Sequence, residues 1–289
     1  MISDFCVDLA SLHGSLAQRL EAVKAAGFHS TVAQAATLVG ELDARGTLDL
    51  RGVTLTALHA RIDYEGLQGP LHAHKLGVAQ SLLRLCQRLG CPLLVLDAST
   101  LSVSSNTIGS IVADLRKLSM LAIVLGVKVA WRAHPGAAHA RDFMVAADVI
   151  QLAERPNLGL SLDVQEWLDP EADLAQLDGI DAQSLLQVQL ADTFSPLSPA
   201  QTLNGEQRLF PGEGLHAPAL RALMARLGQV GYRGHFAFAD VRGDGAVQPN
   251  ADVMARAERS ASHLALDVLR RSQPLTLHRR RAGAIPSVG

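Results

Sequence analysis

Polar and charged side chains stand where apolar runs of this sequence end, and their types could support proton transfer or anion binding. In the stretch 157–167 an apolar run ends at Asp163, and a second carboxylate, Glu166, follows three residues later. Arg132 ends another apolar run. A guanidinium close to a carboxylate lowers the pKa of the acid and holds both groups in a charged, hydrogen-bonded pair. Such residues could perform acid–base catalysis, although Asp163 could also simply cap the next helix.

The elements that would position these residues alternate between strands and helices along most of the chain. Apolar runs of strand length, each followed by a helical pattern, argue for a parallel sheet, and eight such units argue for closure into an α/β barrel. We therefore predict one barrel over residues 1–272, followed by a loosely packed basic tail over residues 273–289. The expected strands are Ile2–Leu9, Phe28–Ala35, Val53–Leu58, Cys91–Asp97, Val127–Arg132, Asn157–Asp163, Leu185–Asp192 and His235–Asp240.

Composition narrows the class of protein. The 289 residues are 48% hydrophobic and carry a formal net charge of −2, which gives no nucleic-acid footprint. Cys6, Cys86 and Cys91 are an odd, widely spaced set without metal-ligand spacing, as expected in a reducing compartment. No signal-peptide pattern or membrane-spanning run is found. We expect a cytoplasmic protein with a small-molecule ligand, no nucleic-acid partner and no membrane contact, and whether it forms a homo-oligomer is left open.

In a barrel of this kind, the carboxyl ends of all strands meet at one mouth, where ligands bind. We predict that Asp163, Gln189 and Glu166 line this mouth together and face inward. Glu166 with His59 or His134 could supply acid–base catalysis, and Arg132 could bind a carboxylate or stabilise an enolate. Other residues expected near the ends of these strands are Asp97, Asp192 and Asp240.

Several segments resemble, in the same order, those of sugar phosphate isomerase/epimerase proteins, which have xylose isomerase-like TIM barrels. The resemblance is strongest to bacterial 3-dehydroshikimate dehydratases and covers residues 1 to about 272. It implies a (β/α)8 barrel with lyase or isomerase chemistry on a small hydroxylated acid or sugar. The segments are Ser11–Phe28, Asp63–Gly66, Pro156–Asp163, Val188–Asp192, Phe210–Gly214 and Gly231–Gly234.

The resemblance also implies a divalent-metal site, and here the sequence departs from the family pattern. The family holds its metal with Glu, Asp, Gln or His, and Glu at the ends of the fifth to eighth strands. At those positions this chain has Arg132, Asp163, Gln189 and Ala239. Only Asp163 and Gln189 are retained as metal ligands, in an incomplete set. The family's Asp-x-x-His reads Asp163-Val-Gln-Glu166.

The ligand-binding residues expected from this comparison lie around the same mouth. The family has an Arg directly before the segment that reads Asp63-Tyr-Glu-Gly66 here, whereas this chain has Ile62 at that position and Arg61 one residue earlier. Asp97 ends the fourth strand. Arg208 and Glu213 flank or lie within the Phe210–Gly214 loop, which borders the mouth in the family. These four residues are our candidates for substrate binding.

Three functions remain open at this point. The first is an enzyme with altered, metal-independent lyase or isomerase chemistry, in which Arg132 takes the place of the metal by neutralising Asp163 and hydrogen-bonding the Gln189 side-chain carbonyl. The second is a non-catalytic ligand-binding or partner protein, a pseudoenzyme. The third is a conventional enzyme with a divalent metal. On the first two interpretations no cofactor is expected.

Overall fold

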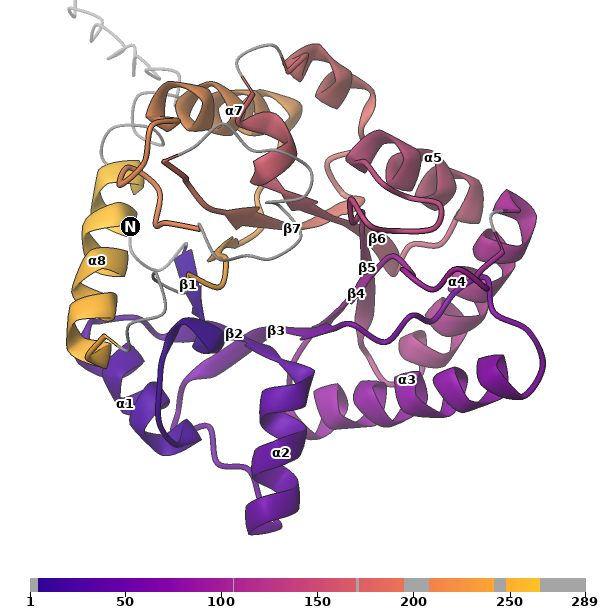
Figure 1. Ribbon diagram of the computed structural model, residues 1–289, viewed down its shortest axis with the longest axis horizontal. Helices are drawn as coiled ribbons and strands as arrows, with labels where there is room; N and C mark the ends of the chain where they lie inside the picture. Colours follow the sequence, from indigo (N-terminus) through magenta and orange to yellow (C-terminus); the bar gives the residue numbers. More distant parts are fainter. Residues whose placement is uncertain (1–4, 106, 170–171, 195–207, 242–247, 266–289) are drawn as a thin grey trace, which may run out of the picture.

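The computed structural model describes residues 5–105, 107–169, 172–194, 208–241 and 248–265. Eight parallel strands close into a barrel in sequence order, and β1 pairs with β8. Helices surround the strands on the outside (Figure 1). The predicted barrel is confirmed, and the 273–289 tail lies outside the described residues. The strands are β1 Phe5–Asp8, β2 Ser30–Gln34, β3 Thr54–Ala60, β4 Leu93–Asp97, β5 Lys128–Arg132, β6 Leu158–Asp163, β7 Leu185–Leu190 and β8 Phe236–Phe238.

The helices alternate with the strands, as the predicted pattern requires. Helix α5 begins at Phe143 because Asp142 caps it by accepting a hydrogen bond from the Val145 N–H. The described helices are α1 Leu16–Ala25, α2 Ala35–Arg45, α3 Gly69–Leu89, α4 Ile108–Ile123, α5 Phe143–Ala153, α7 Ala217–Val230 and α8 Asn250–His263, with short 3-10 helices η2 Leu9–Ser11, η3 Val164–Trp167 and η4 Leu174–Gly179.

Two apolar regions hold the barrel together. The larger lies between the sheet and the surrounding helices and contains most of the buried Leu, Val and Phe side chains. A smaller cluster, which includes Cys6, Val32, Val95 and Ala130, comes from alternate positions of neighbouring strands and is separate from it. Because successive strand residues point to opposite faces, the second cluster is the interior of the barrel. The polar residues described next lie above it.

Among the described residues, no helix is long and apolar enough to cross a membrane.

Candidate functional site

The ends of β4, β5 and β7 are joined by one buried arginine. Asp97 and Arg132 are register neighbours on β4 and β5. Arg132 Nε and Nη2 lie 2.7 and 2.6 Å from Asp97 Oδ1, and Arg132 Nη1 donates to Gln189 Oε1 on β7. Arg132 is only 8% exposed. Burial alone would raise the pKa of Asp97, but the Arg132 and Arg61 guanidiniums outweigh it and hold that pKa below its ordinary value.

A buried chain of hydrogen bonds runs from Arg132 through Gln189 and His59 to Gln187. The bond from Arg132 determines which group donates in each later bond. Because Gln189 Oε1 accepts from Arg132, its Nε2 donates, and the acceptor at 3.3 Å is His59 Nδ1. His59 Nε2 must then carry the proton, which it donates to Gln187 Oε1 at 2.9 Å. Burial, reinforced by Arg132, lowers the pKa of His59 to about 3. His59 is therefore neutral, and both its ring nitrogens are already engaged.

Asp8, at the end of β1, lies beside this chain and was missed by the sequence analysis. Its Oδ1 accepts from the Ala10 N–H at 2.9 Å, and its Oδ2 accepts from Gln34 Nε2 at 2.7 Å. Asp8 Oδ2 is 3.9 Å from His59 Nδ1. Burial raises the pKa of Asp8 to about 6. Asp8 and Gln34 are the last residues of β1 and β2, so the strand-end position that identifies Asp97 also identifies them.

Asp163 pairs with Arg208. Arg208 Nη2 lies 2.8 Å from Asp163 Oδ2 and 2.6 Å from Gln165 Oε1. Burial opposes ionisation, but Arg208 and then Arg132 hold the pKa of Asp163 below its ordinary value. Of the contacts predicted for Arg132, the one to Gln189 is confirmed, whereas the ion pair within the described residues is made with Asp97 and not Asp163. The reason is register, because Asp97 is directly opposite Arg132 on the adjoining strand.

Glu166 turns away from the other predicted mouth residues, so the prediction that it faces inward with Asp163 and Gln189 was wrong. It lies in η3, and its Oε2 accepts a 2.7 Å hydrogen bond from the Phe143 N–H at the start of α5. A helix N-terminus has free N–H groups that attract a carboxylate, which explains this orientation. Burial nevertheless raises the pKa of Glu166 to about 8.

A cavity of about 190 Å³ opens beside the Arg132–Asp97 pair and contains three of the predicted residues, Arg61, Asp97 and His134. Arg61 is mostly exposed, and its Nε lies 2.9 Å from Asp97 Oδ2. Within the described part of the chain, no donor directs a well-aligned hydrogen bond at this buried Oδ2. Asp63 supports the cavity wall by accepting from the Thr100 N–H and hydroxyl at 2.7 and 3.0 Å.

His134 is half-buried in the same cavity. Its Nδ1 accepts a 3.1 Å hydrogen bond from the Gly136 N–H, so the proton of the neutral ring is on Nε2. Burial lowers the pKa of His134, with Asp97 acting against the shift. His134 is thus a neutral donor at the mouth.

The loop after β7 is fixed by two carboxylates that the sequence analysis placed near the mouth. Asp192 accepts hydrogen bonds at 3.1 Å from the N–H groups of Gly212, Gly214 and His216. Glu213 pairs with Arg256 of α8 at 2.6 Å. Both acids hold the loop that carries Arg208, and neither lines the cavity beside Asp97.

The family model described as xylose isomerase-like TIM barrel matches residues 20–264. The chain belongs to this family. It is 27% identical over 230 residues to a 3-dehydroshikimate dehydratase of Pseudomonas aeruginosa, covering 78% of this chain but only 36% of that protein. The chain therefore spans about a third of the length of this curated relative.

Solved structures of family type share the fold. A xylose isomerase-like TIM barrel/4-hydroxyphenylpyruvate dioxygenase fusion protein superposes with a TM-score of 0.81 at 22% identity, over 96% of this chain and 45% of that one. An IOLI protein with a bound zinc atom superposes with a TM-score of 0.72 at 19% identity, over 93% and 99% of the two chains.

Two residues of the expected metal-ligand set, Asp163 and Gln189, already contact guanidiniums in the described residues. Over the residues that the structure describes, no group of three or more His, Cys, Asp or Glu side chains could hold a metal. The Asp163 carboxylate and the Gln189 carbonyl oxygen each accept from a guanidinium, and the buried Ala239 offers no side-chain donor. A divalent cation would also be repelled by Arg132.

Proposed function

We propose that this barrel binds a small hydroxylated carboxylic acid at its mouth and acts on it as a metal-independent lyase or isomerase. The observation that carries the proposal is the Arg132 guanidinium, which is bonded to both Asp97 and Gln189 among the strand ends. A fixed cation at this point can stabilise negative charge that develops on a ligand, without a metal ion.

The cavity beside Asp97 has complementary groups for such a ligand. Two groups of the cavity can donate hydrogen bonds to a ligand carboxylate. The Arg61 guanidinium is mostly exposed and can be reached by a ligand. The neutral His134 ring carries its proton on Nε2 and can donate it in a hydrogen bond. Asp97 Oδ2 lies 2.9 Å from Arg61 Nε and so holds this guanidinium beside the cavity. The volume of about 190 Å³ favours a compact molecule. In this arrangement His134 is the group placed to donate a proton, and Arg61 is the cation that lines the cavity and could stabilise negative charge that develops on the ligand.

A second candidate function is ligand binding without catalysis. Of the acid–base residues expected from the sequence, Glu166 points to α5 and His59 has both nitrogens engaged. His134 alone of these three borders the cavity. A binding protein needs the donors of the cavity but no proton transfer, so these contacts favour it as the alternative.

One experiment separates the two candidates and the metal-dependent alternative. Protein purified without chelator is mixed with a panel of hydroxylated acids and sugars that includes 3-dehydroshikimate, and both thermal shift and product formation are measured with and without EDTA. Turnover that EDTA leaves unchanged supports the enzyme. A thermal shift without turnover supports the binding protein. Activity abolished by EDTA and restored by a divalent metal would overturn metal independence.

Matched variants locate the binding site. Arg61→Gln and His134→Asn should each weaken binding at least tenfold, because each removes a ligand donor. Arg51→Gln and His74→Asn change exposed residues of the same types elsewhere on the surface and serve as controls. Equal affinities in the variants and the controls would exclude this cavity as the ligand site.

A further inference from the structure

The helical layer around the barrel is incomplete between α5 and α7. Every other described connection between consecutive strands contains an α-helix, whereas the described part of the β6–β7 connection (residues 164–169 and 172–184) contains only the short η3 and η4 helices. Figure 1 shows these short turns between the two longer helices. An eight-unit barrel normally covers its strands with one full helix per connection. Here the outer layer is thinner.

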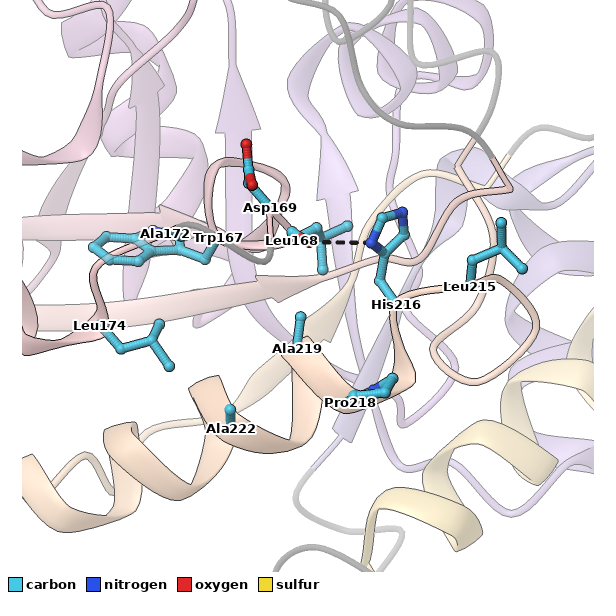
Figure 2. A pocket seen from close by; sticks show the side chains of 10 residues that line it. All are labelled: Trp167, Leu168, Asp169, Ala172, Leu174, Leu215, His216, Pro218, Ala219 and Ala222. Atoms are coloured by element: carbon cyan, nitrogen blue, oxygen red, sulfur yellow. Dashed lines mark hydrogen bonds between the residues drawn. The ribbon is translucent and has the colours of Figure 1, made fainter.

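Three adjoining hollows follow from this gap, and together we name them the α5–α7 groove. Two of them, of about 490 and 730 Å³, lie on the α5 side and share Met144. The third, of about 290 Å³, lies on the α7 side and shares Trp167 and Ala172 with the 730 Å³ hollow. Figure 2 shows apolar side chains on both sides of this third hollow, such as Leu174 and Ala222. The groove is therefore largely apolar along its floor.

The rim of the groove on the α5 side is acidic. Five exposed carboxylates line its two larger hollows, against the single basic residue Arg155. Glu166 also lines the groove but adds little negative charge, because burial raises its pKa to about 8. A surface of this sign attracts a basic segment. The five are Asp142, Asp148, Glu154, Asp173 and Asp181.

We propose that residues 266–289 of this same chain bind in the α5–α7 groove. This segment contains five arginines and one aspartate, so its charge is opposite to that of the rim. Leu275, Leu277 and Ile285 flank Arg279–Arg281 and provide apolar side chains for the floor. This proposed contact differs from the loosely packed tail expected from the sequence, and it is independent of the function proposed above.

The length of the segment permits this contact. Helices of an α/β barrel run antiparallel to its strands, so α8 ends at the same end of the barrel as α5, where Glu154 and Arg155 lie. Passing α7 and the short helices of the gap requires about 30 Å, or three helix diameters. The thirteen residues 266–278, when extended, span about 40 Å before Arg279. An extended segment of this length therefore brings the arginines to the acidic rim.

Cysteine cross-linking in the full chain tests the proposal. Gln151→Cys, on the exposed face of α5 in the groove, is combined with Ala282→Cys; this pair changes none of the charges involved. Asp43→Cys on α2, far from the groove, is combined with Ala282→Cys as the control (Figure 1). The native Cys6, Cys86 and Cys91 are buried. Under mild oxidation, the groove pair should form an intramolecular disulfide at least tenfold faster than the control pair.

Charge reversal supplies the second arm. Replacing Arg279, Arg280 and Arg281 by Glu in the groove pair should slow cross-linking at least fivefold, and 0.5 M salt should have a similar effect on the unreversed pair. Equal rates for the groove and control pairs, or a rate unchanged by charge reversal, would overturn the proposal. A disulfide formed only between two chains would also overturn it, since the occupant would then be a second copy.

Discussion

Arg132 contacts a single oxygen of Asp97 with two of its nitrogens. Its Nε and Nη2 both approach Asp97 Oδ1, at 2.7 and 2.6 Å, while Asp97 Oδ2 faces Arg61 and the cavity. Asp97 is thus neutralised from the β5 side, and it also holds Arg61 beside the cavity. This relationship connects the stability of the barrel mouth with its binding chemistry.

Removing the Arg132 guanidinium should destabilise the protein strongly. Arg132→Met leaves Asp97 and the Gln189 carbonyl without their buried donor, and breaking a buried ion pair in this way costs about 3–5 kcal/mol. Arg132→Lys should lose less free energy of unfolding but cannot bridge both partners with one point charge. Urea unfolding of both variants measures the loss. Arg233→Lys, an exposed arginine with backbone contacts, is the control, and similar losses at both positions would contradict the assignment.

Rebuilding an acidic donor set should create a metal site. Arg132→Glu with Ala239→Glu supplies two carboxylates beside Asp163 and Gln189, but Arg208 still occupies Asp163. We therefore expect the triple variant that adds Arg208→Gln to bind Zn²⁺ or Mn²⁺ at least tenfold more tightly than the double variant in calorimetric titrations. Stoichiometric metal binding by the unaltered protein would show instead that its own residues suffice.

The sequence predicts the barrel well because each strand–helix unit can be recognised from a short stretch of residues. Repeating this unit eight times gives the closed parallel sheet. The sequence also places Asp97, Arg132 and Gln189 at one mouth, because strand-end position follows from the fold. Which acid pairs with which arginine depends on register between strands, and Asp97 rather than Asp163 faces Arg132 for that reason. The orientation of Glu166 depends on a free N–H group of α5, which lies 23 residues away in the sequence.

Glu166 should make stability fall as the pH rises. Its pKa is raised from 4.5 to about 8 in the folded protein, so the folded state holds a proton that the unfolded state has released between these values. The free energy of unfolding should therefore decrease from about pH 4.5 to about pH 8 and then level off. Glu166→Gln keeps an acceptor for the Phe143 N–H and should remove about 1–3 kcal/mol of this decrease. Urea unfolding at pH 5, 6.5 and 8 measures it, and identical pH profiles would contradict the shift.

Gly214→Ala should loosen the loop that carries Arg208. A Cβ at Gly214 would lie 2.4 Å from both Asp192 Oδ1 and the Thr193 carbonyl oxygen. These distances are too short for a carbon atom, so the loop would have to shift away from Asp192. We expect a loss of about 1–3 kcal/mol in the free energy of unfolding. Gly228→Ala in α7 meets nothing within 4 Å and should be neutral or slightly stabilising. Chemical denaturation of the two variants compares them, and an equally stable Gly214→Ala protein would rule out the tight packing.

His59 should remain neutral in the folded protein across the physiological pH range, with its proton on Nε2. The tautomer follows from Arg132, which makes Gln189 Nε2 the donor to His59 Nδ1. Nitrogen-detected NMR of the imidazole should therefore show one protonated and one unprotonated nitrogen from pH 8 down to the onset of acid unfolding. Because the folded pKa of about 3 lies below the ordinary value of 6.5, stability from this group is complete above pH 6.5 and is lost as the pH falls toward 3. His74, which is exposed on α3, is the internal reference for an accessible ring in the same spectra. Titration of His59 near pH 6 in the folded state would show that the ring is reached by solvent. It would then be open to proton transfer, and His59 would return as a catalytic candidate beside His134.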